Sequence, residues 1–367
     1  MKEGLRRVII SGGGSGGHVF PAITIANELR SRFPGVDILF VGAKGKIEME
    51  KVPLAGYKIE GLWISGLQRS LTWRNVMFPI KLASSLLKAR NILRNFRPQV
   101  VVGVGGFASG PTLYVAAKMG IPTLVQEQNS YPGLTNRWLA KSVNRICVAY
   151  DKMERFFPKG KLALTGNPVR LDLESPVSRE KAQEHFGLEP RKKTILVMGG
   201  SLGARTFNQV MASQVEKIVS HQEIQWIWQI GKIYKDTFLN CSTANLKNVA
   251  AKIFIDQMDL AYRASDLIIC RAGALTISEI CLLGKPAILV PSPNVAEDHQ
   301  TVNARSLSDQ SASRLISDHE APEKLIETAL QLIHNENELN ALAKQARKLA
   351  EPNATKKIIS EILTIVR

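Results

Sequence analysis

Residues 8–18 read Val8-Ile9-Ile10-Ser11-Gly12-Gly13-Gly14-Ser15-Gly16-Gly17-His18. An apolar run is followed by a glycine-rich turn, and a helical segment is predicted from Pro21 to Arg30. Strand, glycine turn and helix together form a phosphate site, because glycines let backbone N–H groups approach an anion and the helix start adds its positive dipole end. His18 adds a side chain that titrates near neutral pH. The stretch therefore predicts group transfer as well as binding.

Length and charge limit the class of protein. A chain of 367 residues, 45% of them hydrophobic, is long enough for two domains. The net charge of +16 favours an anionic partner such as nucleic acid, anionic lipid or a phosphorylated substrate. Four scattered cysteines without CxxC or metal-ligand spacing indicate reduced thiols. No apolar stretch approaches the roughly 18–20 residues that cross a bilayer, and no signal peptide is recognised, so we expect a cytoplasmic protein.

The second half of the chain repeats the unit of the first. The apolar strand Thr194–Met198 leads into the glycine-rich run 199–205 and a helical stretch through Val219. Further β-like runs lie between helical segments, at Ile38–Val41, Val100–Val104, Thr123–Val125, Arg145–Ala149, Ile224–Gln229, Lys252–Ile255, Asp266–Cys270 and Ala287–Val290. This alternation predicts an α/β protein with two Rossmann-like domains that face a cleft. Ligands are then expected at the carboxyl ends of the strands.

The domain boundary is predicted at the turn-forming cluster Gly166-Asn167-Pro168. Residues 1–168 are expected to form the first domain and residues 169–351 the second. The last helical stretch, 352–367, is expected to pack back on the first domain.

A dinucleotide site is a rival interpretation of the first glycine turn. Gly12, Gly14 and Gly17 have the spacing GxGxxG, but such a site also needs a carboxylate at the end of the second strand, about 20 residues on. That strand ends without one, although Lys44 and Lys46 leave an NADP enzyme open. The sequence has neither GxxxxGK[ST] nor an Asp-x-Asp triplet. A leaving phosphate would therefore be stabilised by backbone amides, helix ends and Arg or Lys.

Two polar clusters follow strands in the second half. The run 270–273 leads into a predicted helix start at Ala274–Thr276, where unpaired N–H groups suit a phosphate or a sugar hydroxyl. Glu279 lies about one turn further and suits the vicinal diol of a ribose; a solvated helix glutamate is the alternative. Gln300 and Asn303 share a face of the next predicted helix and suit sugar hydroxyls; helix capping is the alternative.

In these motifs the sequence resembles the inverting glycosyltransferases of family 28 that form lipid II for peptidoglycan. The resemblance extends nearly from end to end, and the joint order and spacing of the motifs are specific. Those of the first half are Gly13-Gly14-Ser15-Gly16-Gly17-His18-Val19-Phe20-Pro21, Gly105-Gly106-Phe107-Ala108-Ser109-Gly110-Pro111, Glu127-Gln128-Asn129, Gly133-Leu134-Thr135-Asn136 and Gly166-Asn167-Pro168-Val169-Arg170. Those of the second half are Gly199-Gly200-Ser201-Leu202-Gly203-Ala204-Arg205, Arg271 to Glu279, His299-Gln300 and Asn303-Ala304.

The resemblance implies a glycosyltransferase-B fold whose second domain holds most of the donor. It implies transfer of N-acetylglucosamine from UDP-N-acetylglucosamine to the 4-hydroxyl of the N-acetylmuramoyl group of lipid I. Lipid I is undecaprenyl-pyrophosphoryl N-acetylmuramoyl-pentapeptide, so the resemblance places the enzyme at the cytoplasmic side of the inner membrane, as a peripheral protein.

The resemblance also implies roles for single residues. Asn129 matches a position at the donor sugar, Arg170 a donor-binding arginine and Ser201 a phosphate contact. Ile255 matches a backbone contact to uracil, and Glu279 matches the ribose carboxylate. The full set that we expect to bind UDP-N-acetylglucosamine is Ser15, Gly16, Gly17, Asn129, Arg170, Ser201, Ile255, Arg271, Ala274, Leu275, Thr276, Glu279, Gln300 and Asn303.

Gln300, with Asn303 as its neighbour, matches the residues around the acetamido sugar. Two positions depart from the family pattern. Ser15 stands where the family usually has Thr, and the hydroxyl is kept. Gln126 stands where some relatives have His, which removes one possible acid–base group.

Inverting transfer needs a base for the acceptor hydroxyl and stabilised charge on departing UDP. We expect His18 to be the base, directly or by positioning another group. Glu127 is the rival, and a positioned water and a purely structural His18 stay open. Ser201, the glycine amides and Arg170 or Arg271 would neutralise the diphosphate. This design needs no metal and no cofactor, although loose association of Mg²⁺ stays open.

A basic amphipathic segment accounts for part of the positive charge. Residues 61–98 contain no acidic residue. Apolar residues, among them Trp73, alternate there with Arg69, Arg74, Lys81, Lys88, Arg90, Arg94 and Arg97. This pattern predicts that segment 69–97 lies on anionic inner-membrane lipid. An ordinary surface helix is the alternative, and nucleic acid is not expected because no RRM, KH or zinc-knuckle signature is present.

Three classes of protein remain. A nucleotide-sugar glycosyltransferase is favoured, a UDP-sugar epimerase of similar fold is second, and a non-enzymatic nucleotide- or membrane-binding protein is third. UDP release that depends on an acceptor separates the first from the second. Any turnover separates both from the third.

Overall fold

The computed structural model divides the chain into two compact units. One comprises Met1–Arg170 with Glu351–Arg367, and the other comprises Leu171–Ala350. The predicted boundary, after Pro168, lies two residues earlier. The structure describes residues 4–66, 77–170, 173, 176–200, 202–295 and 298–366.

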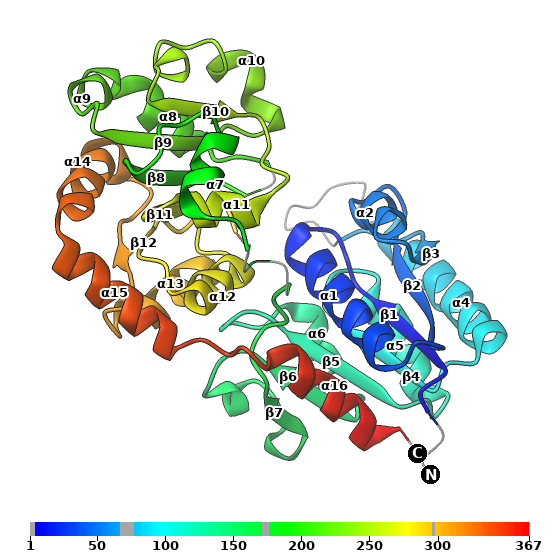
Figure 1. Ribbon diagram of the computed structural model, residues 1–367. Coiled ribbons are helices and arrows are strands. Elements are labelled where there is room, and N and C mark those ends of the chain that lie inside the picture. The colour runs from blue at the N-terminus through cyan, green and yellow to red at the C-terminus, as the bar shows by residue number, and fades with distance from the viewer. Residues whose placement is uncertain are drawn as a thin grey trace. The chain divides into compact units, whose positions relative to one another are not determined.

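The first unit is built on a parallel sheet, whose seven described strands have the order β3-β2-β1-β4-β5-β6-β7 (Figure 1). Its strands are β1 Arg7–Ser11, β2 Asp37–Ala43, β3 Lys58–Leu62, β4 Val100–Gly103, β5 Thr123–Glu127, β6 Arg145–Val148 and β7 Leu162–Leu164. Its helices are α1 Gly16–Arg32, α2 Glu48–Leu54, α4 Phe78–Phe96, α5 Ser109–Lys118, α6 Leu134–Leu139 and α16 Ala354–Ile365. Strand order reverses beside β1, which pairs with both β2 and β4. Ligands of such sheets bind at this switch point.

Helices cover both faces of this sheet, which explains the unbroken apolar runs of its strands. Val8 and Ile10 belong to the core layer that contains α1 and α16. Ile9, between them, belongs to the opposite layer with Leu113 of α5. Ile358 of α16 is fully buried in the first layer, so the end of the chain completes the core of this unit.

The second unit is a parallel sheet of the same kind, with six described strands in the order β10-β9-β8-β11-β12-β13 (Figure 1). Its strands are β8 Lys193–Met198, β9 Ile224–Gln229, β10 Val249–Lys252, β11 Leu267–Cys270, β12 Ala287–Leu289 and β13 Arg314–Leu315. Its helices are α7 Arg179–His185, α8 Arg205–Ser213, α9 Val215–Ser220, α10 Lys235–Phe238, α11 Met258–Ala264, α12 Ala274–Leu283, α13 His299–Ser308, α14 Ala321–His334 and α15 Glu336–Lys348. The predicted α/β class with two parallel-sheet domains is confirmed.

The sequence patterns did not predict the edge strands of the two sheets correctly. The strands β3, β7 and β13 were not predicted, and β10 lies three residues before its predicted start at Lys252. All four are edge strands. An edge strand is paired on one side only and is partly exposed, so it lacks the continuous apolar run of a central strand.

Some helices also begin or end at other residues than the sequence predicts. α1 begins at Gly16, so the predicted start at Pro21 is wrong and the proline lies inside the helix. Glycine is a weak helix former and proline favours a first turn, so local preference misplaced this start. The helix predicted to run through Val219 is interrupted at Gln214. The predicted start of α12 at Ala274 is confirmed.

Candidate active site

Three loops of the first unit follow the neighbouring strands β1, β4 and β5, so they lie at one edge of its sheet. The turns after β1 and β4 touch, since the Gly13 N–H donates to the Gly105 oxygen at 3.3 Å. A Cβ on Gly106 would lie 2.1 Å from the Gly13 oxygen, so a side chain at position 106 would separate the two turns.

His18 lies in the first turn of α1, where it is partly exposed. Its Nδ1 lies 3.2 Å from the Ser15 hydroxyl. A Cβ on Gly105 would lie 2.8 Å from His18 Nε2 and 3.6 Å from Asn136 Nδ2, so the imidazole and this amide both adjoin Gly105. The fold therefore brings His18 close to the start of α6, which contains Asn136.

The glycine turn offers fewer N–H groups to an anion than its sequence predicts. The N–H groups of Gly12 and Gly13 donate to backbone oxygens, and that of Gly14 donates to Glu48 Oε2 at 2.8 Å. Gly16 and Gly17 open α1, where N–H groups lack intrahelical acceptors. A phosphate at this turn would therefore bind at Gly16 and Gly17.

Glu127, the last residue of β5, is 1% exposed and accepts four hydrogen bonds. Oε1 accepts from the N–H and the Nδ2 of Asn129, at 3.0 and 3.3 Å. Oε2 accepts from the Gly133 N–H at 3.1 Å and from Asn136 Nδ2 at 2.8 Å. Burial raises the pKa of the Glu127 carboxyl, and these hydrogen bonds oppose the rise. The geometry favours a structural role for Glu127, whose carboxylate holds the loop 128–133 and the start of α6, over the role of rival base that the sequence left open.

Gln126 belongs to the core and not to a solvent-facing acid–base position. It is fully buried, and its Nε2 donates to Asn167 Oδ1 at 3.1 Å. Asn167 Nδ2 in turn donates to the Gln128 oxygen at 3.1 Å. A side chain at position 126 therefore links β5 to the segment that leads to Arg170, which is partly exposed.

In the second unit, the loops after β8, β11 and β12 also follow neighbouring strands. Ser201, in the loop after β8, lies outside the described residues. Gly273 precedes α12 in an extended conformation and offers no side-chain cap, so the first turn of α12, with Leu275 and Thr276, presents backbone N–H groups at the carboxyl edge of the sheet.

Glu279 of α12 has a partner that the sequence did not reveal. The hydroxyl of Tyr262, on α11, donates to Glu279 Oε2 at 2.7 Å. Tyr262 is 1% exposed, whereas Glu279 is partly exposed. Tyr262 therefore orients the carboxylate, and no local pattern links these residues. Ile255, in the segment between β10 and α11, is buried, and its role at uracil stays a prediction.

Asn303 and Gln300 of α13 have different environments. Asn303 is fully buried, and its Nδ2 donates to the Ala272 oxygen at 3.3 Å, which supports the loop before α12. Gln300 is partly exposed, and its Oε1 accepts the Ser292 N–H at 2.8 Å. Gln300 can face a sugar, whereas the burial of Asn303 gives it a supporting role.

Arg271 is held by groups of its own unit. Its Nη1 donates to Asp318 Oδ1 at 2.5 Å and to the backbone oxygens of Val290 and Pro291. Its guanidinium also lies 4.7 Å above the Phe207 ring. These contacts join the ends of β11 and β12. The roles of Arg271 and Arg170 at the donor diphosphate stay predictions.

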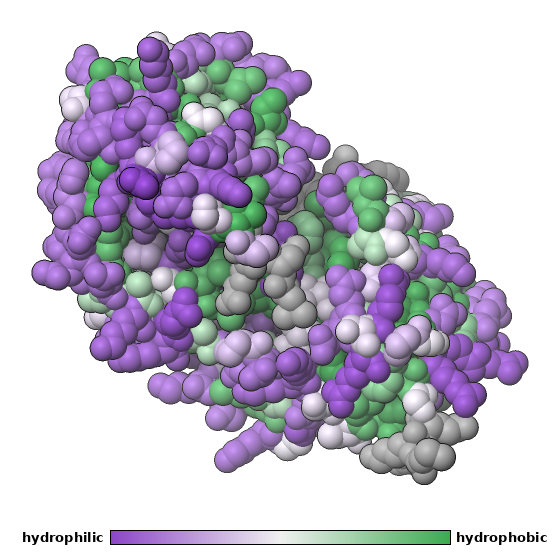
Figure 2. Space-filling view, viewed as in Figure 1, coloured by the Kyte–Doolittle hydropathy of each residue, from purple (hydrophilic) through white to green (hydrophobic). Residues whose placement is uncertain are grey.

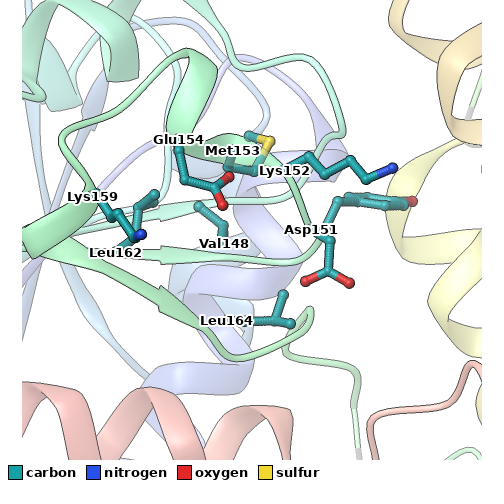
Figure 3. A pocket seen from close by; sticks show the side chains of 9 residues that line it. Val148, Asp151, Lys152, Met153, Glu154, Lys159, Leu162 and Leu164 are labelled. Carbon is teal, nitrogen blue, oxygen red and sulfur yellow. The ribbon is translucent and has the colours of Figure 1, made fainter.

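Two cavities lie apart from the predicted site residues. One of about 130 Å³ lies beside the carboxyl end of β6, where Lys152 and Glu154 line it (Figure 3). This volume is below the roughly 300 Å³ of a small ligand pocket. The other, of about 320 Å³, lies beside α13 and is lined by Arg305 and His319. No predicted site residue lines either cavity. Among the described residues, no cluster of His, Cys, Asp or Glu could hold a metal ion.

Two doubly wound parallel sheets in one chain, each with a glycine turn after the strand at its switch point, define the glycosyltransferase-B class of fold. The models of the glycosyltransferase family 28 N-terminal and C-terminal domains match residues 8–148 and 194–359. The chain belongs to glycosyltransferase family 28.

Named relatives agree with this assignment. The UDP-N-acetylglucosamine--N-acetylmuramyl-(pentapeptide) pyrophosphoryl-undecaprenol N-acetylglucosamine transferase of Parabacteroides distasonis is 52% identical, over 98% of each chain. The crystal structure of Acinetobacter baumannii MurG matches with a TM-score of 0.74 and 26% identity, over 98% of this chain and 99% of that one. The UDP-GlcNAc 2-epimerase of Neisseria meningitidis matches with a TM-score of 0.69 and 15% identity, over 98% of this chain and 100% of that one, and so shares the fold alone.

Proposed function

We propose that this chain is an inverting hexosyltransferase. It moves N-acetylglucosamine from UDP-N-acetylglucosamine to the 4-hydroxyl of the N-acetylmuramoyl group of lipid I and forms lipid II and UDP. The observation that carries the proposal is the 52% identity, from end to end, with a relative named for this transfer. An epimerase role has less support, because the epimerase of Neisseria meningitidis is 15% identical and shares the fold alone.

Most of the donor binds to the second unit in this proposal, and Arg170, the last residue of the first stretch of the first unit, adds a positive charge for the diphosphate. The first turn of α12 and Ser201 hold the diphosphate with Arg170, and Glu279 binds the ribose hydroxyls. Gln300 adjoins the acetamido sugar. Helix N-termini and arginine stabilise the negative charge that develops on departing UDP, so the mechanism needs neither metal nor cofactor.

The acceptor is activated at the first unit. Its 4-hydroxyl oxygen attacks the anomeric carbon from the face opposite UDP, the bond from that carbon to the phosphate oxygen breaks, and UDP leaves with the bonding electrons. His18 takes the hydroxyl proton. Its partial exposure makes this contact possible, whereas Glu127 is buried. Asn129, whose N–H and Nδ2 donate to Glu127 Oε1, adjoins the donor sugar in this proposal.

Release of UDP tests the proposal. UDP-N-acetylglucosamine is incubated with and without a lipid I analogue, in the presence of EDTA. Acceptor-dependent release that survives EDTA is the expected result. Donor that is epimerised instead, or bound without turnover, would overturn the proposed transfer.

Replacement of Glu279 by alanine should weaken UDP binding about 10- to 100-fold, because a hydrogen bond to a charged group contributes roughly 1.5–3 kcal/mol. Tyr262→Phe should have a smaller effect in the same direction, since it removes the hydroxyl that orients Glu279. Titration calorimetry with UDP measures both. Glu327→Ala on the exposed face of α14 is the control. Unchanged affinity in Glu279→Ala would remove the ribose role.

We also propose that the first unit binds anionic lipid at the cytoplasmic side of the membrane through α4. Residues 69–76 of the predicted segment lie outside the described residues, and no described helix is long and apolar enough to cross a bilayer. In α4, Ala89 and Leu93 are buried in the core, whereas Ile80 and Leu87 are 56% and 66% exposed. Figure 2 shows that hydrophobic residues, in green, are interspersed with hydrophilic ones on the face of the molecule in view. One face of α4 therefore packs in the core, as in an ordinary surface helix, and the exposed face is the one that we propose to contact lipid.

The double variant Ile80→Ser/Leu87→Ser should bind phosphatidylglycerol vesicles about tenfold more weakly, because buried apolar area contributes roughly 25 cal/mol per Å². Cosedimentation with vesicles measures the bound fraction. Leu54→Ser is the matched control, since Leu54 is 74% exposed on α2. Equal binding by the double variant and the control would exclude α4 as the lipid-binding element.

A further inference from the structure

We infer that Glu48 is a positioning residue for this transfer: its buried carboxylate fills the anion site of the first glycine turn and thereby holds Ser15 and His18 in place. The inference rests on the proposed function of His18. Sequence analysis did not single out Glu48, and it lies outside the set of residues expected to bind the donor.

The carboxylate of Glu48 bridges the end of β2 and the glycine turn. Glu48 is the first residue of α2 and is 1% exposed. Its Oε2 accepts the N–H of Gly14 at 2.8 Å, and its Oε1 accepts the N–H of Ala43 at 2.9 Å. An internal carboxylate therefore takes the backbone donor that the sequence assigns to a phosphate.

Two glycines make room for this side chain. A Cβ on Gly13 would lie 2.1 Å from the carboxyl carbon of Glu48, and a Cβ on Gly42 would lie 2.6 Å from its Cγ. Real Cβ atoms do not approach other atoms this closely, so a side chain at either position would displace the carboxylate. The glycine at position 13 is thus explained by Glu48 and not by a bound phosphate.

No described lysine or arginine forms an ion pair with Glu48. A buried carboxylate without a cation is costly, and it persists here through charge-assisted hydrogen bonds from backbone N–H groups. Because the site at Gly14 is already filled, an external phosphate can use only the N–H groups at the start of α1. Glu48 thus restricts where the anionic groups of the substrates bind.

The effect of Glu48 reaches His18 through one residue. Gly14 is followed by Ser15, whose backbone oxygen accepts the N–H groups of His18 and Val19 at 3.1 and 3.2 Å. The Ser15 hydroxyl lies 3.2 Å from His18 Nδ1. A shift of Gly14 therefore moves the Ser15 oxygen that accepts the His18 N–H and the Ser15 hydroxyl beside the imidazole. Misplacement of a reacting group by about 1 Å can lower a rate roughly 100-fold.

Glu48→Gln tests the inference, because the amide keeps the shape but presents N–H groups to one of the two donors. We expect kcat for acceptor-dependent UDP release to fall about 10- to 100-fold. The Kd for UDP should stay within about twofold of wild type, since most of the groups proposed to bind UDP belong to the second unit. Glu50→Gln is the control, because Glu50 lies on the same helix and is 66% exposed. Wild-type kcat in Glu48→Gln would overturn the inference.

A double variant separates positioning from folding. If Glu48 acts through His18, Glu48→Gln should lower the residual rate of His18→Ala less than twofold. Multiplicative losses would show that Glu48 acts elsewhere. Should Glu48→Gln fail to fold, Gly42→Ala displaces the same side chain, with Gly35→Ala as the unhindered control. An inactive wild type would contradict the proposed function itself, whereas an active wild type with an unaffected Glu48→Gln contradicts only this inference.

Discussion

Replacement of His18 by alanine should lower kcat for acceptor-dependent UDP release by about 10²- to 10⁴-fold, the usual contribution of a general base. The imidazole is partly exposed, is oriented by Ser15 and adjoins Gly105, so its removal takes away the proton acceptor without opening the core. UDP affinity, which in this proposal depends mainly on the second unit, should stay within about twofold of wild type. A coupled assay of UDP release and UDP calorimetry measure the two quantities.

His334→Ala controls for the loss of any exposed histidine, since His334 lies on α14 with 53% of its side chain exposed. It should retain wild-type kcat and unfold at the wild-type temperature. A folded His18→Ala protein with full turnover would remove the base assignment and leave a positioned water as the acceptor of the proton.

Replacement of Glu127 by glutamine should destabilise the first unit by about 1–3 kcal/mol, because the amide nitrogen would face N–H groups that now donate to an oxygen. All four donors come from the loop after β5 and the first turn of α6, so this segment should lose its conformation and kcat should fall at least tenfold. Urea unfolding and the UDP-release assay measure the effects. Glu154→Gln, at an exposed position of the same unit, should change neither.

The raised pKa of Glu127 also predicts opposite effects of pH on stability and activity. Between the ordinary carboxyl pKa and the raised pKa in the folded state, the folded protein binds a proton that the unfolded chain lacks. The contribution of Glu127 to stability is therefore fully present below the ordinary pKa and is lost as pH rises through the folded pKa. Activity should change the other way, because only the ionised carboxylate accepts all four hydrogen bonds.

Urea unfolding of wild type and Glu127→Gln between pH 4 and 8 isolates the contribution of Glu127 to stability. As pH rises, the unfolding free energy of wild type should fall relative to that of the variant. A pH-independent difference would show that Glu127 ionises normally. Turnover in Glu127→Gln at the wild-type rate, at every pH, would show that the loop does not depend on the carboxylate.

Local patterns in the sequence determined the fold class and the positions of the site loops. The central strands of a sheet covered on both faces must be apolar throughout, so runs such as Val8–Ile10 and Thr194–Met198 were recognised without knowledge of their neighbours. The glycine turns and the start of α12 at Ala274 follow from backbone requirements that act within a few residues. Family resemblance rests on these same local motifs.

Only the tertiary structure decided which side chains of the site form hydrogen bonds with residues that are distant in the sequence. Tyr262 meets Glu279, Asp318 meets Arg271, and Glu48 meets Gly14 across 17 to 47 positions in the sequence. Edge strands such as β13 depend in the same way on a neighbour that no local pattern reveals. The physical reason is that a hydrogen bond is short and directional. Its partner is therefore known only when the order of the strands has placed two segments, distant in the sequence, side by side.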